Sequence, residues 1–81
     1  MTYEAVMQEV QEIFRDITDN PDIHLKPETT AGDIEEWDSL THIQLVVGIE
    51  AHFKINFTAE EIGGLGNIDE MCKSILKKIT V

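Results

Sequence analysis

One central stretch of the sequence decides the fold: Glu-Trp-Asp-Ser-Leu-Thr-His-Ile-Gln-Leu-Val-Val-Gly-Ile-Glu-Ala-His-Phe, from Glu36 to Phe53. Its apolar residues favour a helix. Asp38 is placed to cap that helix, because its carboxylate can accept hydrogen bonds from the first backbone N–H groups. Ser39 then lies in the first turn, where unpaired N–H groups and the positive end of the helix dipole favour an anion. The stretch therefore predicts a helix whose first serine is well placed to carry a phosphate ester.

This helix is apolar on two sides, at about 100° of rotation per residue. The first arc runs in line with Ser39 and consists of Ile43, Val46 and Glu50, with Leu40 and Val47 beside them. The second arc consists of Leu45, Ile49 and Phe53. One arc is enough to form a core, and the first contains a glutamate. We therefore expect the first arc to be exposed and to act as a docking surface.

Both ends of the chain also show helical periodicity. Thr2 to about Asp16 is strongly amphipathic, and turn-forming residues from Thr18 to Pro21 end it. The last segment has Asn67 as its cap. Its apolar stripe, predicted to be buried, consists of Ile68, Met71, Cys72, Ile75, Leu76 and Ile79. Two amphipathic helices are therefore expected to pack against the central one.

Between the central and last helices, Thr58-Ala59-Glu60-Glu61 has the form of a capping box, which starts a short helix that the following glycines end. The residues from Thr18 to Trp37 form a long connection without sustained periodicity, with a short helical turn expected around Asp33 to Glu35. Spaced apolar residues should pin this loop across the bundle: Ile23, Leu25, Ile34 and Trp37. The fold class is thus all-α, a bundle of three main helices plus one short helix, in one domain over residues 1–81.

Charge and composition limit the partners. Sixteen acidic and six basic residues give a net charge of −10, which disfavours nucleic acid and anionic membranes and favours basic patches on other proteins. The alternative is that the acidity merely keeps a small protein soluble. Cys72 is the single cysteine, so no internal disulfide can form. No apolar run reaches the length of a membrane span, and the N-terminus lacks the layout of a signal peptide. We expect a cytoplasmic protein without membrane insertion.

The motif Asp38-Ser39-Leu40 lies at the head of the central helix and is shared with a known family. With the acidic balance, the long first loop and the short helix after Thr58, the chain resembles an acyl carrier protein over essentially its whole length. A lone Asp-Ser-Leu is weak evidence, whereas the same tripeptide at this position in this helix pattern is specific. The alternative is that Ser39 is only a capping or solvated serine in an unrelated bundle.

The resemblance implies a covalent cofactor, 4′-phosphopantetheine, which a phosphopantetheinyl transferase moves from coenzyme A onto Ser39, beside Asp38. The thiol of this arm would hold acyl groups as thioesters for acyl-activating, acyl-transferring and condensing enzymes with basic docking patches. The protein itself would catalyse nothing and would be a stand-alone monomer. A flexible arm raises the effective concentration of its cargo at a docked enzyme.

On the same basis, partner contacts are assigned to two sets of residues. The apolar contacts are Leu40, Ile43 and Val47, for which core packing is the alternative. The acidic contacts are Glu50, Glu60 and Glu61, for which a plain solvated face is the alternative.

The sequence also departs from carriers of fatty acid synthesis, which usually have acids directly after Asp-Ser-Leu and along the helix. Here the equivalent positions are Thr41, Gln44, Gly48 and Ala51. We interpret this as a carrier for a specialised pathway such as polyketide or modified-lipid synthesis. An aminoacyl carrier of nonribosomal synthesis, an ordinary fatty acid carrier and an unmodified interaction subunit with the same fold remain alternatives.

Other candidate sites receive little support from the sequence. Trp37 is expected to pack the loop against the bundle, with contact to the transferase or the arm as the alternative. His42 could touch the phosphate or lie partly buried, and no third group completes a catalytic relay with it. The histidines at 24, 42 and 52 share neither a face nor a ligand spacing, so no metal site is expected.

Overall fold

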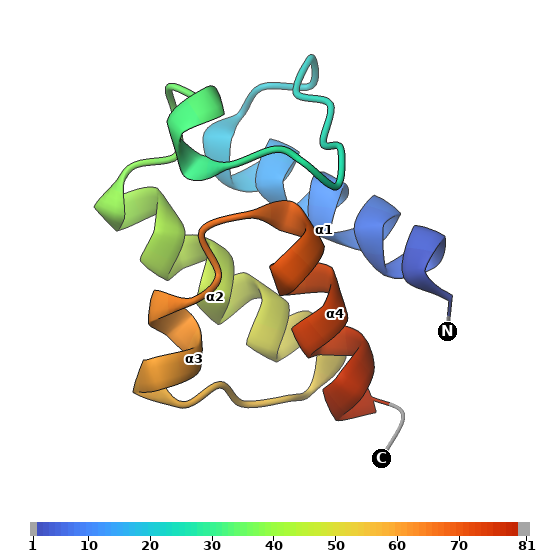
Figure 1. Cartoon of the computed structure of the whole chain (residues 1–81). Helices are drawn as coiled ribbons and strands as arrows, with labels where there is room; N and C mark the ends of the chain where they lie inside the picture. The colour runs from blue at the N-terminus through green and yellow to red at the C-terminus, as the bar shows by residue number, and fades with distance from the viewer. Residues whose placement is uncertain (1, 80–81) are drawn as a thin grey trace.

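The computed structural model describes residues 2–79 and contains four α-helices and one 3₁₀ helix (Figure 1). In chain order these are α1 (Tyr3–Thr18), η1 (Ala31–Asp33), α2 (Ser39–Phe53), α3 (Ala59–Gly63) and α4 (Ile68–Ile79). Helix α1 packs against both α2 and α4. The all-α bundle of three main helices and one short helix is therefore confirmed.

The helices begin where the sequence signals place them. The Asp38 carboxylate accepts the Thr41 N–H at 2.8 Å, and the Asn67 side chain accepts the Glu70 N–H at 2.7 Å. At the start of α3, the Thr58 hydroxyl and the Glu61 carboxylate each accept the other residue's backbone N–H. These caps satisfy donors that have no partner inside the helix, which fixes the first residue of each element.

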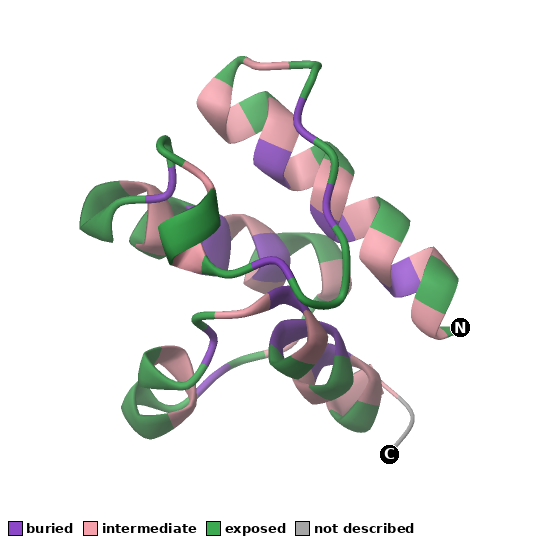
Figure 2. Ribbon diagram, turned by 45° about the horizontal axis from the view of Figure 1, so that its top comes forward, coloured by how far each residue is buried: buried purple, intermediate pink, exposed green. Residues whose placement is uncertain are grey.

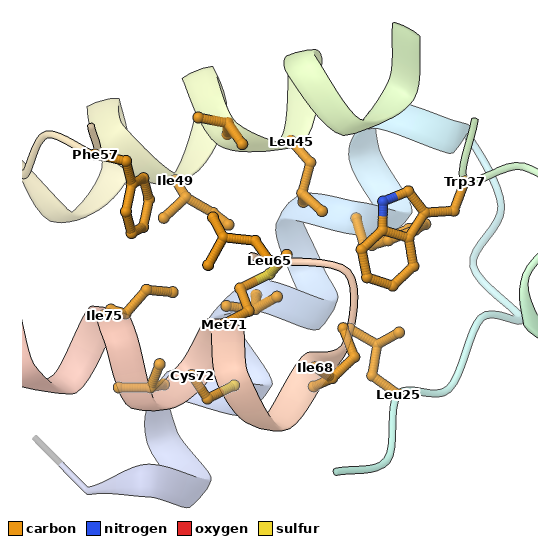
Figure 3. Close-up of a cluster of buried hydrophobic side chains, with 14 of the residues drawn as sticks. Leu25, Trp37, Leu45, Ile49, Phe57, Leu65, Ile68, Met71, Cys72 and Ile75 are labelled. Atoms are coloured by element: carbon orange, nitrogen blue, oxygen red, sulfur yellow. The ribbon is translucent and has the colours of Figure 1, made fainter. Parts of the chain in front are cut away.

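The core lies where α1, α2 and α4 meet (Figure 2). Figure 3 shows Leu45 and Ile49 of α2 directed toward the α4 side chains Met71 and Ile75, with Leu65 between them. Each of these side chains is almost completely buried, and burial of one such side chain stabilises the fold by about 1.5–3 kcal/mol. The core is therefore mainly aliphatic, with Phe14, Trp37 and Phe57 as its buried aromatic residues.

The long loop is tied down at both ends. Ile23, Leu25 and Trp37 are buried in the core, and the Trp37 ring meets the Phe14 ring edge to face at 5.3 Å. Near its middle the loop pairs with the start of α4, because the Ala31 N–H donates to the Gly66 carbonyl at 2.9 Å and the Ile68 N–H donates to Thr29. The loop is thus part of the bundle and fixes how α2 begins.

Two local expectations need correction. The helical turn in the loop lies at Ala31–Asp33 instead of Asp33 to Glu35, because the Asp33 carboxylate accepts the Thr30 N–H and starts the turn there. Val46, placed on the exposed arc, is buried with 3% of its surface exposed. On the helical wheel Val46 lies about 20° from Phe53 and about 60° from Ile43, so it belongs to the core side.

Candidate functional site

Ser39 is exposed as the first residue of α2. The preceding residue, Asp38, is extended and turns its carboxylate onto the Thr41 N–H, so the chain enters the helix at Ser39. This hydrogen bond lowers the pKa of the Asp38 carboxyl, which therefore remains ionised at neutral pH. The geometry leaves the Ser39 hydroxyl open to an approaching enzyme at the positive end of the helix dipole.

A surface cavity of about 570 Å³ adjoins Ser39, between α2, the loop before it and α3. Its lining combines apolar and small residues with the polar head of α2: Ala31, Trp37, Asp38, Ser39, His42, Ile43, Ile62, Gly63 and Gly66. A flexible, mostly neutral chain attached to Ser39 can lie along such a surface. The residues present therefore fit a phosphodiester-linked arm at this position.

Trp37 and His42 form one wall of this cavity. The Trp37 Nε1–H donates to His42 Nδ1 at 3.0 Å, and the two rings are nearly parallel, with their centroids 6.0 Å apart. Because the indole nitrogen can only donate, His42 Nδ1 must accept, and His42 Nε2–H then donates to the Ile62 carbonyl at 3.0 Å. Both nitrogens of His42 are occupied by the protein. His42 therefore links the loop, α2 and α3, and it is poorly placed to act as a general base.

The three apolar residues assigned to docking lie on the surface. Leu40, Ile43 and Val47 are 68%, 53% and 58% exposed. Such a group of large exposed side chains on one helix is unusual for a small acidic protein and is typical of an interaction surface. Core packing, the alternative for these three residues, is thus excluded by their exposure.

The three acidic residues differ from one another. Glu60 is exposed, whereas the Glu50 carboxylate accepts the Phe57 N–H at 2.8 Å and holds the connection from α2 to α3. The Glu61 carboxylate accepts the Thr58 N–H and pairs with Lys78 Nζ at 2.9 Å, and these two contacts lower its pKa. Glu50 and Glu61 therefore have structural partners within the chain, whatever they contact outside it.

Sequence reasoning did not place the far side of the cavity. Ile62, Gly63 and Gly66 face the head of α2 there, although they are remote from Ser39 in the sequence. The glycines and the capping box predict that a short helix ends in this region. No local signal gives the position of that helix relative to α2, because this depends on packing.

None of the helices within residues 2–79 is long and apolar enough to cross a membrane. Within the same range, no three or more side chains of His, Cys, Asp or Glu are grouped so that they could hold a metal ion.

Comparisons with known proteins identify the family of this chain. The family described as "Phosphopantetheine attachment site" matches residues 8–75, and the chain therefore belongs to this family of phosphopantetheine-binding carrier proteins. Its cofactor is a covalently attached 4′-phosphopantetheine.

A solved structure gives a more specific comparison than the family model. The chain is 37% identical to the holo acyl carrier protein from Geobacter metallireducens, whose structure was determined by solution NMR. The match covers 93% of this chain and 86% of that chain, with a TM-score of 0.86. The fold and the carrier class are therefore those of acyl carrier proteins. A search of curated proteins finds no match.

Proposed function

We propose that Ser39 carries the 4′-phosphopantetheine arm and that the arm holds acyl groups as thioesters for a specialised biosynthetic pathway. The observation that carries the proposal is the position of Ser39, exposed at the first turn of α2 beside the cavity. Asp38 orders this turn through its hydrogen bond to the Thr41 N–H. The domain over residues 1–81 would act as a cytoplasmic monomer and would catalyse nothing itself.

In the attachment step, the Ser39 hydroxyl oxygen attacks the phosphorus of coenzyme A that bears the pantetheine. A bond forms between Ser39 Oγ and that phosphorus, and the bond between the phosphorus and the bridging pyrophosphate oxygen breaks. Adenosine 3′,5′-bisphosphate leaves, and the hydroxyl proton passes to a base of the transferase. The exposed first turn gives the transferase the in-line approach that such a displacement needs.

Partner contacts are proposed at the residues the sequence suggested: Leu40, Ile43, Val47, Glu50, Glu60 and Glu61. The exposure of the three apolar side chains supports their part in this surface. The acidic residues would meet basic patches on acyl-handling enzymes, with Glu50 and Glu61 keeping their contacts inside the chain.

The test is an intact-mass measurement after incubation with coenzyme A, magnesium and a promiscuous phosphopantetheinyl transferase. The natural chain and Ser39→Ala are compared with Ser74→Ala, which removes the chain's other serine, in the middle of α4. We expect the natural chain and Ser74→Ala to gain one arm each and Ser39→Ala to gain none. An arm on Ser39→Ala would mean that another residue is the attachment site. No arm on the natural chain would favour an unmodified interaction subunit.

The acyl cargo is tested separately on the loaded protein. Acyl-activating and aminoacyl-activating enzymes are offered the same arm, and the products are distinguished by mass. Thioesters formed only with amino acids would favour the aminoacyl alternative. Efficient elongation by enzymes of ordinary fatty acid synthesis would remove the case for a specialised pathway, which depends on the scarcity of acids along α2.

A further inference from the structure

The outer face of α2 has few charged side chains in a protein with a net charge of −10. Glu50 is the one acid among the fifteen residues of α2, and its carboxylate accepts the Phe57 N–H. His52, near the end of the helix, pairs with Glu9 of α1 at 2.9 Å. What this helix offers to solvent is therefore mostly apolar or uncharged, with Gln44 and His52 among its exposed side chains, so it has no row of acids to hold a partner by ion pairs.

This face continues into a groove between α1 and α2, a cavity of about 660 Å³. Ile13, Asp16 and Ile17 line it from α1, and Ile43, Val47 and Gly48 are among the residues that line it from α2. Gly48 allows the two helices to approach, because a Cβ there would be 3.1 Å from Ile13 Cγ2. The groove thus has mostly apolar walls, as sites for apolar side chains usually do, with Asp16, Gln44 and His52 as its polar lining residues.

Ile43 joins this groove to the site, because it lines both the groove and the cavity beside Ser39. Each of the two cavities also has one exposed carboxylate in its lining, Asp16 in the groove and Asp38 beside Ser39. An apolar region with a carboxylate on each side is complementary to a partner surface that places cationic side chains around an apolar one.

We propose that enzymes acting at Ser39 dock by inserting an apolar side chain into the groove between α1 and α2, with basic side chains next to Asp16 and Asp38. The proposal rests on the proposed function, and it adds Ile13, Asp16 and Ile17 of α1 to the docking surface. A second copy of this chain fits the same face poorly, because it would bring two proteins of net charge −10 together.

The probe is a promiscuous phosphopantetheinyl transferase with a basic docking face, and the readout is kcat and KM for the carrier at low and high salt. Asp16→Lys reverses the groove carboxylate, and its matched control is Glu4→Lys, an exposed residue in the first turn of α1 with the same change of charge. Val47→Ser removes apolar surface at the groove, and its control is Ala59→Ser on α3. Circular dichroism confirms that each variant is folded.

We expect Asp16→Lys to raise KM about fivefold or more at low salt and less at high salt, because salt screens the charge contact. Val47→Ser should raise KM by a similar factor at both salt concentrations, and both controls should stay within twofold of the natural chain. If Asp16→Lys and Glu4→Lys behave alike, or if Val47→Ser has no effect, the groove is not the docking site.

The same experiment separates the two proposals. A natural chain that is not modified at all contradicts Ser39 as the attachment site. A natural chain that is modified while the groove variants match their controls contradicts only the docking proposal. Sedimentation of the natural chain and of Val47→Ser tests whether a second copy of this chain occupies the groove instead. A dimer that Val47→Ser abolishes would show such a copy and overturn the proposal.

Discussion

At the scale of single residues, His42 joins three parts of the molecule near Ser39. It accepts the Trp37 indole N–H and donates to the Ile62 carbonyl. Replacement His42→Phe keeps a ring of similar size and leaves the buried Trp37 N–H without a partner. We expect the free energy of unfolding to fall by about 1–3 kcal/mol, measured by urea denaturation.

The control for this variant is His24→Phe, the same change at an exposed histidine of the loop. It should alter the free energy of unfolding by no more than about 0.5 kcal/mol. Equal effects of the two changes would mean that the hydrogen bonds of His42 contribute no more to stability than the exposed contact between His24 and Arg15.

Val46 and Val47 are neighbours with opposite surroundings. Val46 is almost fully buried, whereas Val47 is more than half exposed. We expect Val46→Ala to lower the free energy of unfolding by about 1–3 kcal/mol, through lost burial and the cavity left behind. Val47→Ala should stay within about 0.5 kcal/mol of the natural chain, because its side chain is exposed. Equal losses of stability would place Val47 in the core and contradict its role on the surface.

Cys72 shows how burial affects titration. Its thiol is buried on α4, and burial is the main cause that raises its pKa from 9.0 to about 12. A pKa that is higher in the folded state stabilises the fold below the unfolded value, and this contribution is lost as the pH rises through the folded value. We expect stability to fall with pH above about 9, and less steeply in Cys72→Ala. Urea denaturation across this range measures both slopes, and identical slopes would contradict the assignment.

At the scale of elements, local signals predict where the helices start better than they predict which side of α2 is buried. Asp38, Thr58 and Asn67 cap their helices as the sequence indicates, because a cap depends on only three or four adjacent residues. Which side of α2 is buried is harder to predict, because the helix is apolar nearly all round. Val46 shows this limit, since on the helical wheel it lies between the exposed Ile43 and Phe53, which packs against the core, near the boundary of the two arcs.

Helix α3 spans only five residues and depends on contacts outside itself. Lys78 of α4 pairs with Glu61 and lies over the Phe57 ring, 5.5 Å from its centroid. Replacement Lys78→Met keeps the length of the side chain and removes the charge. We expect faster amide hydrogen exchange in α3 and unchanged exchange in the centre of α1, as measured by mass spectrometry.

The matched control is Lys73→Met, which removes an exposed pair with Asp69 within α4. It should leave exchange in α3 as it is in the natural chain. If both variants accelerate α3 equally, the effect comes from the lost positive charge in general, and the contact from Lys78 does not hold α3 in place.

At the scale of the whole molecule, the site could be predicted from the sequence more fully than the groove beside it. Ser39 and Asp38 are adjacent in the chain, and their placement follows from one helix start. The groove joins residues 13–17 to residues 43–52, and its existence depends on how closely α1 approaches Gly48. Periodicity gives the apolar face of each helix, but the distance between two helices follows from the size of the side chains that meet.

The net charge of −10 on 81 residues sets the response of the whole fold to salt. Only six basic residues offset sixteen acids, so repulsion among carboxylates favours the expanded chain, and salt screens this repulsion. We expect the melting temperature to rise as sodium chloride is raised from about 0.01 M to about 0.15 M, where the screening length falls from about 30 Å to about 8 Å. Glu12→Lys, at an exposed position of α1, changes the net charge from −10 to −8, and it should melt higher at low salt and gain less from added salt. Scanning calorimetry measures both proteins, with Glu12→Gln as an intermediate step. A melting temperature that falls with salt would mean that attractive ion pairs outweigh the repulsion in this fold.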